Sequence, residues 1–161
     1  AGSSTPTTLE WTEPSSSSSS FDPAYCSIGV SGDVLTSLTS SYALIDGLSK
    51  NFVSSGMTFD SSTSRMTIDS GNGGTYLMIA TALFSPVPST NGSVYLSIYK
   101  NGASYRSRYF TNGSGSTNNL SANVRCYATV LDGDYFQIYA RGGVSSSCYV
   151  RTPEFSMHRI A

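Results

Sequence analysis

Short apolar runs, each closed by a turn, constrain this chain more than any other feature of its sequence. The run GTYLMIATALF, residues 74–84, is almost continuously apolar and lies between a Gly-Gly pair and Pro86. This pattern is typical of a strand that is buried on both faces. In SVYLSIY, residues 93–99, aliphatic residues alternate with tyrosine and serine, which predicts one aliphatic and one polar aromatic face. The pair Asn101-Gly102 tolerates positive φ, so we expect a tight hairpin to a second strand at 105–110.

The rest of the body repeats this pattern and predicts an all-β domain. Residues 120–130 and 135–140 alternate in the same way on either side of the turn LDGD, residues 131–134. Residues 148–150 and 155–160 predict two further short strands, and no segment has the pattern of a long helix. The total, about eight to ten antiparallel strands, favours a sandwich or a jelly roll.

Residues 1–20 differ in composition from the body of the chain, residues 21–161. They are rich in serine, threonine and proline, which is typical of a flexible N-terminal arm. Leu9 and Trp11 form an apolar island in this arm, and Trp11 is the only tryptophan of the chain. We expect both to anchor the arm on a partner, because tryptophan is enriched among residues that dominate binding energy. The alternative is that Trp11 folds back onto the body or is simply exposed.

The composition excludes two classes of partner. Only 12% of the 161 residues are charged and the net charge is -1, so the chain lacks the basic patch that nucleic-acid binding requires. No segment approaches the ~18 consecutive apolar residues of a transmembrane helix. The N-terminal residues also lack the basic and apolar regions of a secretory signal. We therefore expect neither a nucleic-acid nor a membrane partner.

Tyrosines recur opposite the aliphatic face in three of the predicted strands, at Tyr95, Tyr99, Tyr127, Tyr135 and Tyr139. If these strands are neighbours, the rings form a stripe with large apolar area and polar tips, which suits a subunit contact. We predict the contact there; the alternative is that the stripe belongs to the core of the sandwich. Four arginines are expected to form rim ion pairs or partner contacts: Arg106, Arg108, Arg125 and Arg151.

The sequence contains no pattern typical of catalysis. His158 is the only histidine, and no HExxH, GxSxG or Walker motif accompanies it, so we expect no enzyme and no cofactor. Asp132 and Asp134 flank Gly133 and are candidate calcium ligands. We favour a plain turn at this position, because Asp and Gly satisfy its special backbone angles, and we expect no metal site. The three cysteines, Cys26, Cys126 and Cys148, are expected to be reduced thiols within strands.

Four of these segments together resemble the C1q and tumour-necrosis-factor-like superfamily of jelly rolls. They are Gly74-Thr75-Tyr76, SIYKNG at 97–102, LDGDYFQIYA at 131–140, and a last strand that runs from Phe155 to the C-terminus. The resemblance covers roughly residues 25–161. It implies a ten-strand jelly roll that assembles as a compact homotrimer, with aromatic residues at the threefold axis and the N-terminal segments emerging near one another.

The chain departs from the animal C1q branch because it has neither a Gly-X-Y stalk nor a secretory signal. Its short serine-rich arm is similar to that of phage virion proteins with this fold. The resemblance therefore implies a trimeric decoration (cement) protein on the outer surface of the capsid, held on the major capsid protein by the arm residues Leu9, Trp11, Phe21 and Tyr25.

Two alternatives remain at this point. In the first alternative, the chain is the receptor-binding tip of a phage fibre and recognises a host glycan or protein through residues 111–119 and 142–147. The chain lacks the stalk repeats and heptads of fibre chains, which disfavours this alternative. The other alternative is a soluble C1q-like recognition protein of a cellular organism, which the missing stalk and signal disfavour.

Overall fold

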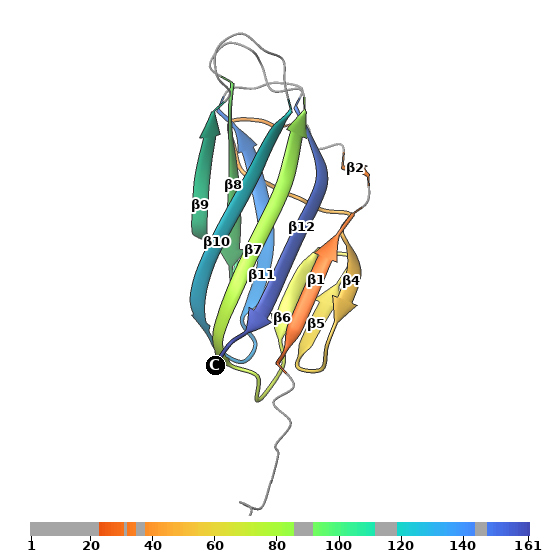
Figure 1. Ribbon diagram of the computed structural model, residues 1–161, viewed down its shortest axis with the longest axis vertical. Helices are drawn as coiled ribbons and strands as arrows, with labels where there is room; N and C mark the ends of the chain where they lie inside the picture. The colour runs from red at the N-terminus through yellow and green to blue at the C-terminus, as the bar shows by residue number, and fades with distance from the viewer. Residues whose placement is uncertain (1–22, 31, 35–37, 86–91, 112–118, 144–147) are drawn as a thin grey trace, which may run out of the picture.

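Two antiparallel sheets face each other in a sandwich (Figure 1). The computed structural model describes residues 23–30, 32–34, 38–85, 92–111, 119–143 and 148–161. Sheet I has the spatial order β10 (Leu120–Val130), β7 (Gly74–Ser85), β12 (Tyr149–Arg159), β1 (Tyr25–Gly29) and β4 (Ser49–Val53), with β2 (Asp33–Val34) beside β12. Sheet II has the order β5 (Met57–Asp60), β6 (Arg65–Ile68), β11 (Tyr135–Gly142), β8 (Ser93–Lys100) and β9 (Ala103–Thr111), with β3 (Ala43–Leu44) beside β11. The described residues include no helix long and apolar enough to cross a bilayer.

The hairpin predicted at Asn101-Gly102 is confirmed. Lys100 pairs with Ala103, so the two residues between them make the whole turn. Asn101 has a φ of 51° and Gly102 a φ of 79°. Two successive positive φ angles match the right-handed twist of the flanking strands, which is why Asn-Gly is favoured in two-residue hairpins.

The described residues form twelve strands, whereas the sequence predicted about eight to ten. Two of the additional strands, β2 and β3, are only two residues long. The two short strands predicted at the C-terminus are instead one, β12, whose register shifts between Arg151 and Glu154. Thr152 has a positive φ of 41° at this shift, and Pro153 lacks an N–H, so the strand bulges without ending.

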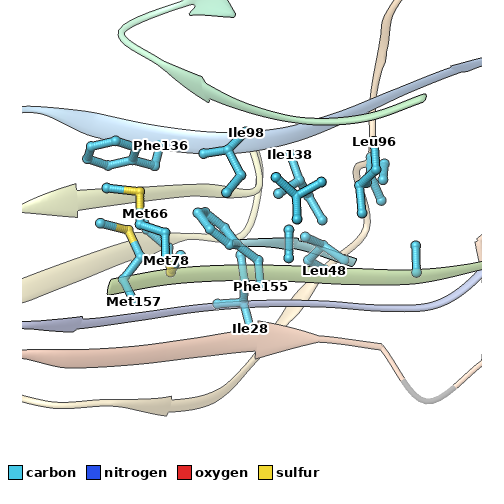
Figure 2. Close-up of a cluster of buried hydrophobic side chains, with 14 of the residues drawn as sticks. Ile28, Leu48, Met66, Met78, Leu96, Ile98, Phe136, Ile138, Phe155 and Met157 are labelled. Carbon is cyan, nitrogen blue, oxygen red and sulfur yellow. The ribbon is translucent and has the colours of Figure 1, made fainter. Parts of the chain in front are cut away.

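A single hydrophobic core fills the space between the sheets (Figure 2). Ile28, Phe155 and Met157 from sheet I meet Ile98 and Phe136 from sheet II, and all five side chains are fully buried. Removing each such side chain from water contributes about 1.5–3 kcal/mol. The aliphatic residues of 93–99 and 120–130 therefore face the core as predicted, and Leu96 and Val124 are fully buried there.

The two ends of the sandwich carry different parts of the chain. Tyr25, at the start of β1, pairs with His158 near the end of β12, so residues 1–22 are attached at the end where the C-terminus lies (Figure 1). At the opposite end β7 and β10 pair as Phe84 with Leu120, and β8 and β9 pair as Ser93 with Thr111. The segments 86–91, 112–118 and 144–147 are attached there.

Candidate functional site

The described residues do not gather the side chains of a metal site. No cluster of three or more His, Cys, Asp or Glu side chains is present among them. His158 lies on β12 with its ring 4.2 Å from the ring of Tyr25, and partial burial lowers its pKa. It therefore contacts an aromatic ring, and no carboxylate or hydroxyl of the described residues forms a hydrogen bond with its imidazole.

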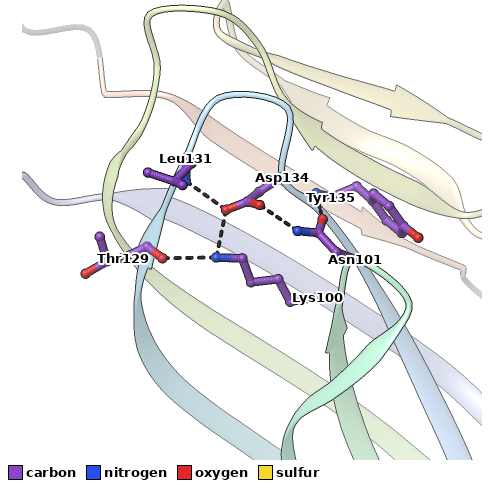
Figure 3. Close-up of polar contacts among 6 residues, drawn as sticks. All are labelled: Lys100, Asn101, Thr129, Leu131, Asp134 and Tyr135. Atoms are coloured by element: carbon purple, nitrogen blue, oxygen red, sulfur yellow. Dashed lines mark hydrogen bonds and ion pairs between the residues drawn. The ribbon is translucent and has the colours of Figure 1, made fainter.

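Asp132 and Asp134 lie in the turn between β10 and β11 and bind different donors. The Asp132 oxygens accept hydrogen bonds from the N–H groups of Gly71 and Gly73, both at 2.7 Å, and these bonds lower its pKa. Asp134 accepts from Lys100, Asn101 and Leu131 instead (Figure 3). Gly133 has a φ of 80° between them, as the turn interpretation requires.

Asp134 is the centre of a polar network between two turns (Figure 3). Its Oδ2 accepts from Lys100 Nζ at 2.7 Å and from the Leu131 N–H at 2.8 Å, while Oδ1 accepts from Asn101 Nδ2 at 2.6 Å. Asn101 Oδ1 in turn accepts from the Tyr135 N–H at 2.9 Å. Burial alone raises the pKa of Asp134, but the hydrogen bonds outweigh burial and the net pKa lies below the ordinary value.

The three cysteines are free thiols. Burial raises the pKa of Cys26 to about 12 and that of Cys148 to about 11, so both remain protonated and inert at neutral pH. Cys126 on β10 is half-buried, and its pKa is also raised by burial, against the opposing effect of Arg106.

Three of the predicted contact tyrosines lie together on the outer face of sheet II. The rings of Tyr99 and Tyr139 stack with centroids 3.9 Å apart. Tyr42 meets Tyr99 edge-on at 5.8 Å, and the Arg141 guanidinium lies 3.9 Å from the ring centre of Tyr95. These side chains cover one another's faces, and the Tyr42 hydroxyl forms a hydrogen bond with Ser107 Oγ at 2.6 Å, so this tyrosine cluster is largely satisfied within the chain.

The other two predicted contact tyrosines do not join this cluster. Tyr135 lies further along β11, where the Arg65 guanidinium covers its ring at 4.5 Å. Tyr127 lies on sheet I, because β10 pairs with β7 and not with β8 or β11. The predicted stripe of five is therefore divided between two faces. None of the five belongs to the core, so the alternative of a core stripe is wrong, while the subunit contact stays a prediction.

Sequence reasoning missed the outer face of sheet I. Residues 74–84 were expected to be buried on both faces, but β7 is fully buried only on the side of Tyr76 and Met78. Leu77, Ile79 and Leu83 point the other way and are half-buried. The signal was present, since a continuous apolar run predicts a cover on both sides of the strand. The sandwich supplies that cover on one side only.

An aromatic and apolar row crosses the outer face of sheet I from strand to strand. Leu77 on β7 pairs with Tyr127 on β10 and with His158 on β12, and His158 pairs with Tyr25 on β1. The ring of Tyr25 stacks on Phe52 of β4 with centroids 5.4 Å apart. Tyr127 is 68% exposed and Phe52 54% exposed. We call these five residues the sheet I row.

Tyr25, predicted to be an anchor of the arm, lies at the edge of the folded body, and its contact with a capsid stays a prediction. It is the first residue of β1, and its backbone N–H donates to Ser54 Oγ at 2.6 Å, so it belongs to the sheet. The other predicted anchors, Leu9, Trp11 and Phe21, lie outside the described residues, as does most of the segments 111–119 and 142–147.

A shallow cavity of about 460 Å³ lies at the β10 edge of the sheet I row. Two arginines from different sheets reach it, Arg106 from β9 and Arg125 from β10. Leu77 and Ile79 also line it. Neither guanidinium group forms a hydrogen bond or an ion pair with the described residues.

The fold resembles two solved structures over most of their length. Eiger TNF from S. frugiperda has a TM-score of 0.62 at 11% identity, covering 86% of this chain and 92% of that one. The globular domain of the zebrafish complement 1qA protein has a TM-score of 0.58 at 17% identity, covering 86% and 98%. No protein-family model matches the sequence, and no curated protein matches it significantly. The chain therefore has a C1q/TNF-like jelly-roll fold.

Proposed function

We propose that this chain is a non-enzymatic virion structural protein that works as a homotrimer and decorates the outer surface of a phage capsid. In this proposal residues 1–20 bind the major capsid protein and the jelly roll projects outward. The observation that carries it is the half-exposed apolar outer face of sheet I, which supports assembly with copies of the same chain.

The sheet I row has the character of a subunit contact. Large exposed side chains that are contiguous on one face of a domain mark interaction sites, whereas single exposed ones are ordinary. Tyr127, Leu77, His158, Tyr25 and Phe52 are contiguous across five strands. We place the contact here in preference to the tyrosine cluster on sheet II, because that cluster already covers its own rings. A rotational trimer is the assembly that the resemblance implies.

The arm and the inter-strand segments are attached at opposite ends of the sandwich, which supports a decorating role. The arm is attached at the end of the sandwich where β1 begins, and three inter-strand segments are attached at the other end (Figure 1). In this proposal the end that carries the arm faces the capsid, and the end that carries the three inter-strand segments faces away from it. Three arms on one trimer bind multivalently, which raises avidity by about 10² to 10⁴ over a single arm.

The arm is tested by cosedimentation with assembled capsids of the phage that carries this chain. We expect the full chain to pellet with the capsids. A variant with Leu9→Ala and Trp11→Ala should stay in the supernatant because it loses both apolar anchors. A matched variant with Ser16→Ala and Ser18→Ala, in the serine run of the same arm, should bind as the wild type does. Equal binding by all three proteins would refute attachment through the arm.

A second candidate is the receptor-binding tip of a fibre, and one observation favours it. The segments 86–91, 112–118 and 144–147 join strands that end side by side, so their attachment points share one end of the sandwich. Such a cluster of connections is where binding residues concentrate on rigid scaffolds. Immunogold labelling of virions separates the two candidates, because label over the head supports decoration and label at the tail tip supports receptor binding.

A further inference from the structure

The cavity between β9 and β10 is lined by positively charged and by apolar side chains. Its lining residues are Leu77, Ile79, Arg106, Arg125, Cys126 and Tyr127. The two guanidinium groups are its charged members, and none of the described carboxylates lines it. Arg106 opposes the rise of the Cys126 pKa, so its charge lies close to this thiol. The charge of this cavity therefore favours an anionic ligand.

Arg106 reaches the cavity because β9, the edge strand of sheet II, lies beside β10, the edge strand of sheet I. It pairs with Ile98, whose side chain faces the core, so Arg106 is on the inward side of β9. Sheet I ends at β10 and does not cover this side, which leaves residues 103–109 exposed. Since the inward side of β9 is uncovered, the cavity is open toward a molecule that docks against the β9 and β10 edge.

The outer face of sheet I carries a carboxylate whose charge is opposite to that of the two arginines. Glu154 on β12 is exposed and pairs with Thr81 of β7, and its neighbour Phe155 is buried on the opposite side. Its carboxylate forms no hydrogen bond or ion pair with the described residues. By contrast, Asp60, Asp69, Asp132 and Asp134 all accept hydrogen bonds within the chain. Asp46 accepts none from the described residues either, but it lies in the connection between β3 and β4 and not on a strand of sheet I. Glu154 is thus a free carboxylate on the face that carries the sheet I row.

We infer that the Arg106 and Arg125 cavity of one subunit binds the Glu154 carboxylate of the next subunit. The inference rests on the proposed homotrimer and adds the ion pair that fixes how its subunits meet. The contact is heterologous, because an edge of one copy meets the face of another, and such contacts close into rings when the rotation allows. Arginine offers a forked set of donors, so two of them bind a carboxylate with geometric specificity.

Charge reversal in the full chain tests the pairing. Arg125→Glu alone and Glu154→Arg alone each place like charges together, and each should raise the trimer dissociation constant at least tenfold in sedimentation equilibrium. The double variant restores opposite charges and should recover most of the wild-type affinity. Arg108→Glu is the matched control, because Arg108 is an exposed arginine of the same β9 strand that does not line the cavity. Its affinity should stay within about twofold of the wild type. Circular dichroism shows whether each variant is folded.

The outcomes separate this inference from the proposed assembly. If the wild type is monomeric, the proposed homotrimer fails and the inference fails with it. If the wild type is trimeric but neither single reversal weakens it, the trimer stands and the cavity inference is overturned. Loss in both single variants without recovery in the double variant also overturns the pairing. A further variant carries both Glu10→Lys and Glu13→Lys in the arm. If this variant weakens the trimer and Glu154→Arg does not, the acidic arm occupies the cavity, which again contradicts the inference.

Discussion

Replacing Asp134 with alanine removes the carboxylate that connects the β8–β9 turn to the β10–β11 turn. The substitution leaves Lys100 Nζ, Asn101 Nδ2 and the Leu131 N–H without the acceptor that they contact at 2.6–2.8 Å (Figure 3). Asp134 is only 8% exposed, so water compensates for the loss incompletely. Unsatisfied donors in such a position cost free energy beyond the lost bonds.

The expected loss of unfolding free energy is about 3 kcal/mol. Hydrogen bonds to a charged group contribute about 1.5–3 kcal/mol each, and breaking a buried ion pair costs about 3–5 kcal/mol. We take the lower end of the second range, because the Lys100 side chain is 22% exposed and can regain water. In a chain of this size the change corresponds to a fall in Tm of about 6–12 °C.

Urea unfolding and calorimetry at one fixed protein concentration measure the effect, since assembly makes Tm concentration-dependent. Asp46→Ala is the matched control, because Asp46 is exposed and makes no hydrogen bond or ion pair with the described residues. It should change the unfolding free energy by less than about 0.5 kcal/mol. A loss below about 1 kcal/mol for Asp134→Ala, or an equal loss for Asp46→Ala, would refute the role of the network.

Three further predictions concern pH, the core and the thiols. Because the folded pKa of Asp134 is lowered, its stabilisation is complete above the ordinary aspartate pKa of about 3.9 and is lost as pH falls through the folded value. The stability difference between the wild type and Asp134→Asn should therefore be constant from about pH 7 to pH 5 and shrink below about pH 4 in urea titrations. Phe155→Ala, at the centre of the core, should cost about 3–5 kcal/mol in the same assay. In iodoacetamide labelling followed by mass spectrometry at pH 8, Cys26 and Cys148 should stay unmodified, while Cys126 should react faster in dissociated subunits than in the assembly.

Local pattern was enough to predict the strands and several turns. Alternation placed Leu96 and Val124 toward the core, and Asn101-Gly102 specified a hairpin through the positive φ that both residues tolerate. These features depend on residues close together in the sequence. The continuity of β12 was not predicted, because Thr152 and Pro153 carry the signal of a break.

The candidate site depends on which strands become neighbours, and a single sequence does not specify that. Tyr127 and Tyr139 alternate with aliphatic residues in the same way, yet β10 pairs with β7 in one sheet and β11 pairs with β8 in the other. The apolar run at 74–84 did indicate a cover on both faces. The single subunit covers only the core face of this strand, and Leu77 and Ile79 on the other face remain half-exposed.

Sedimentation equilibrium on the full wild-type chain, beside Leu77→Asp and Tyr139→Asp, tests the assembly through sheet I most directly. The wild type should have three times the 17.0 kDa mass of one chain. Leu77→Asp places a charge in the middle of the sheet I row and should give folded monomers. Tyr139→Asp changes the tyrosine cluster on sheet II and should remain trimeric. A wild type of single-chain mass, or dissociation by Tyr139→Asp but not by Leu77→Asp, would contradict the account.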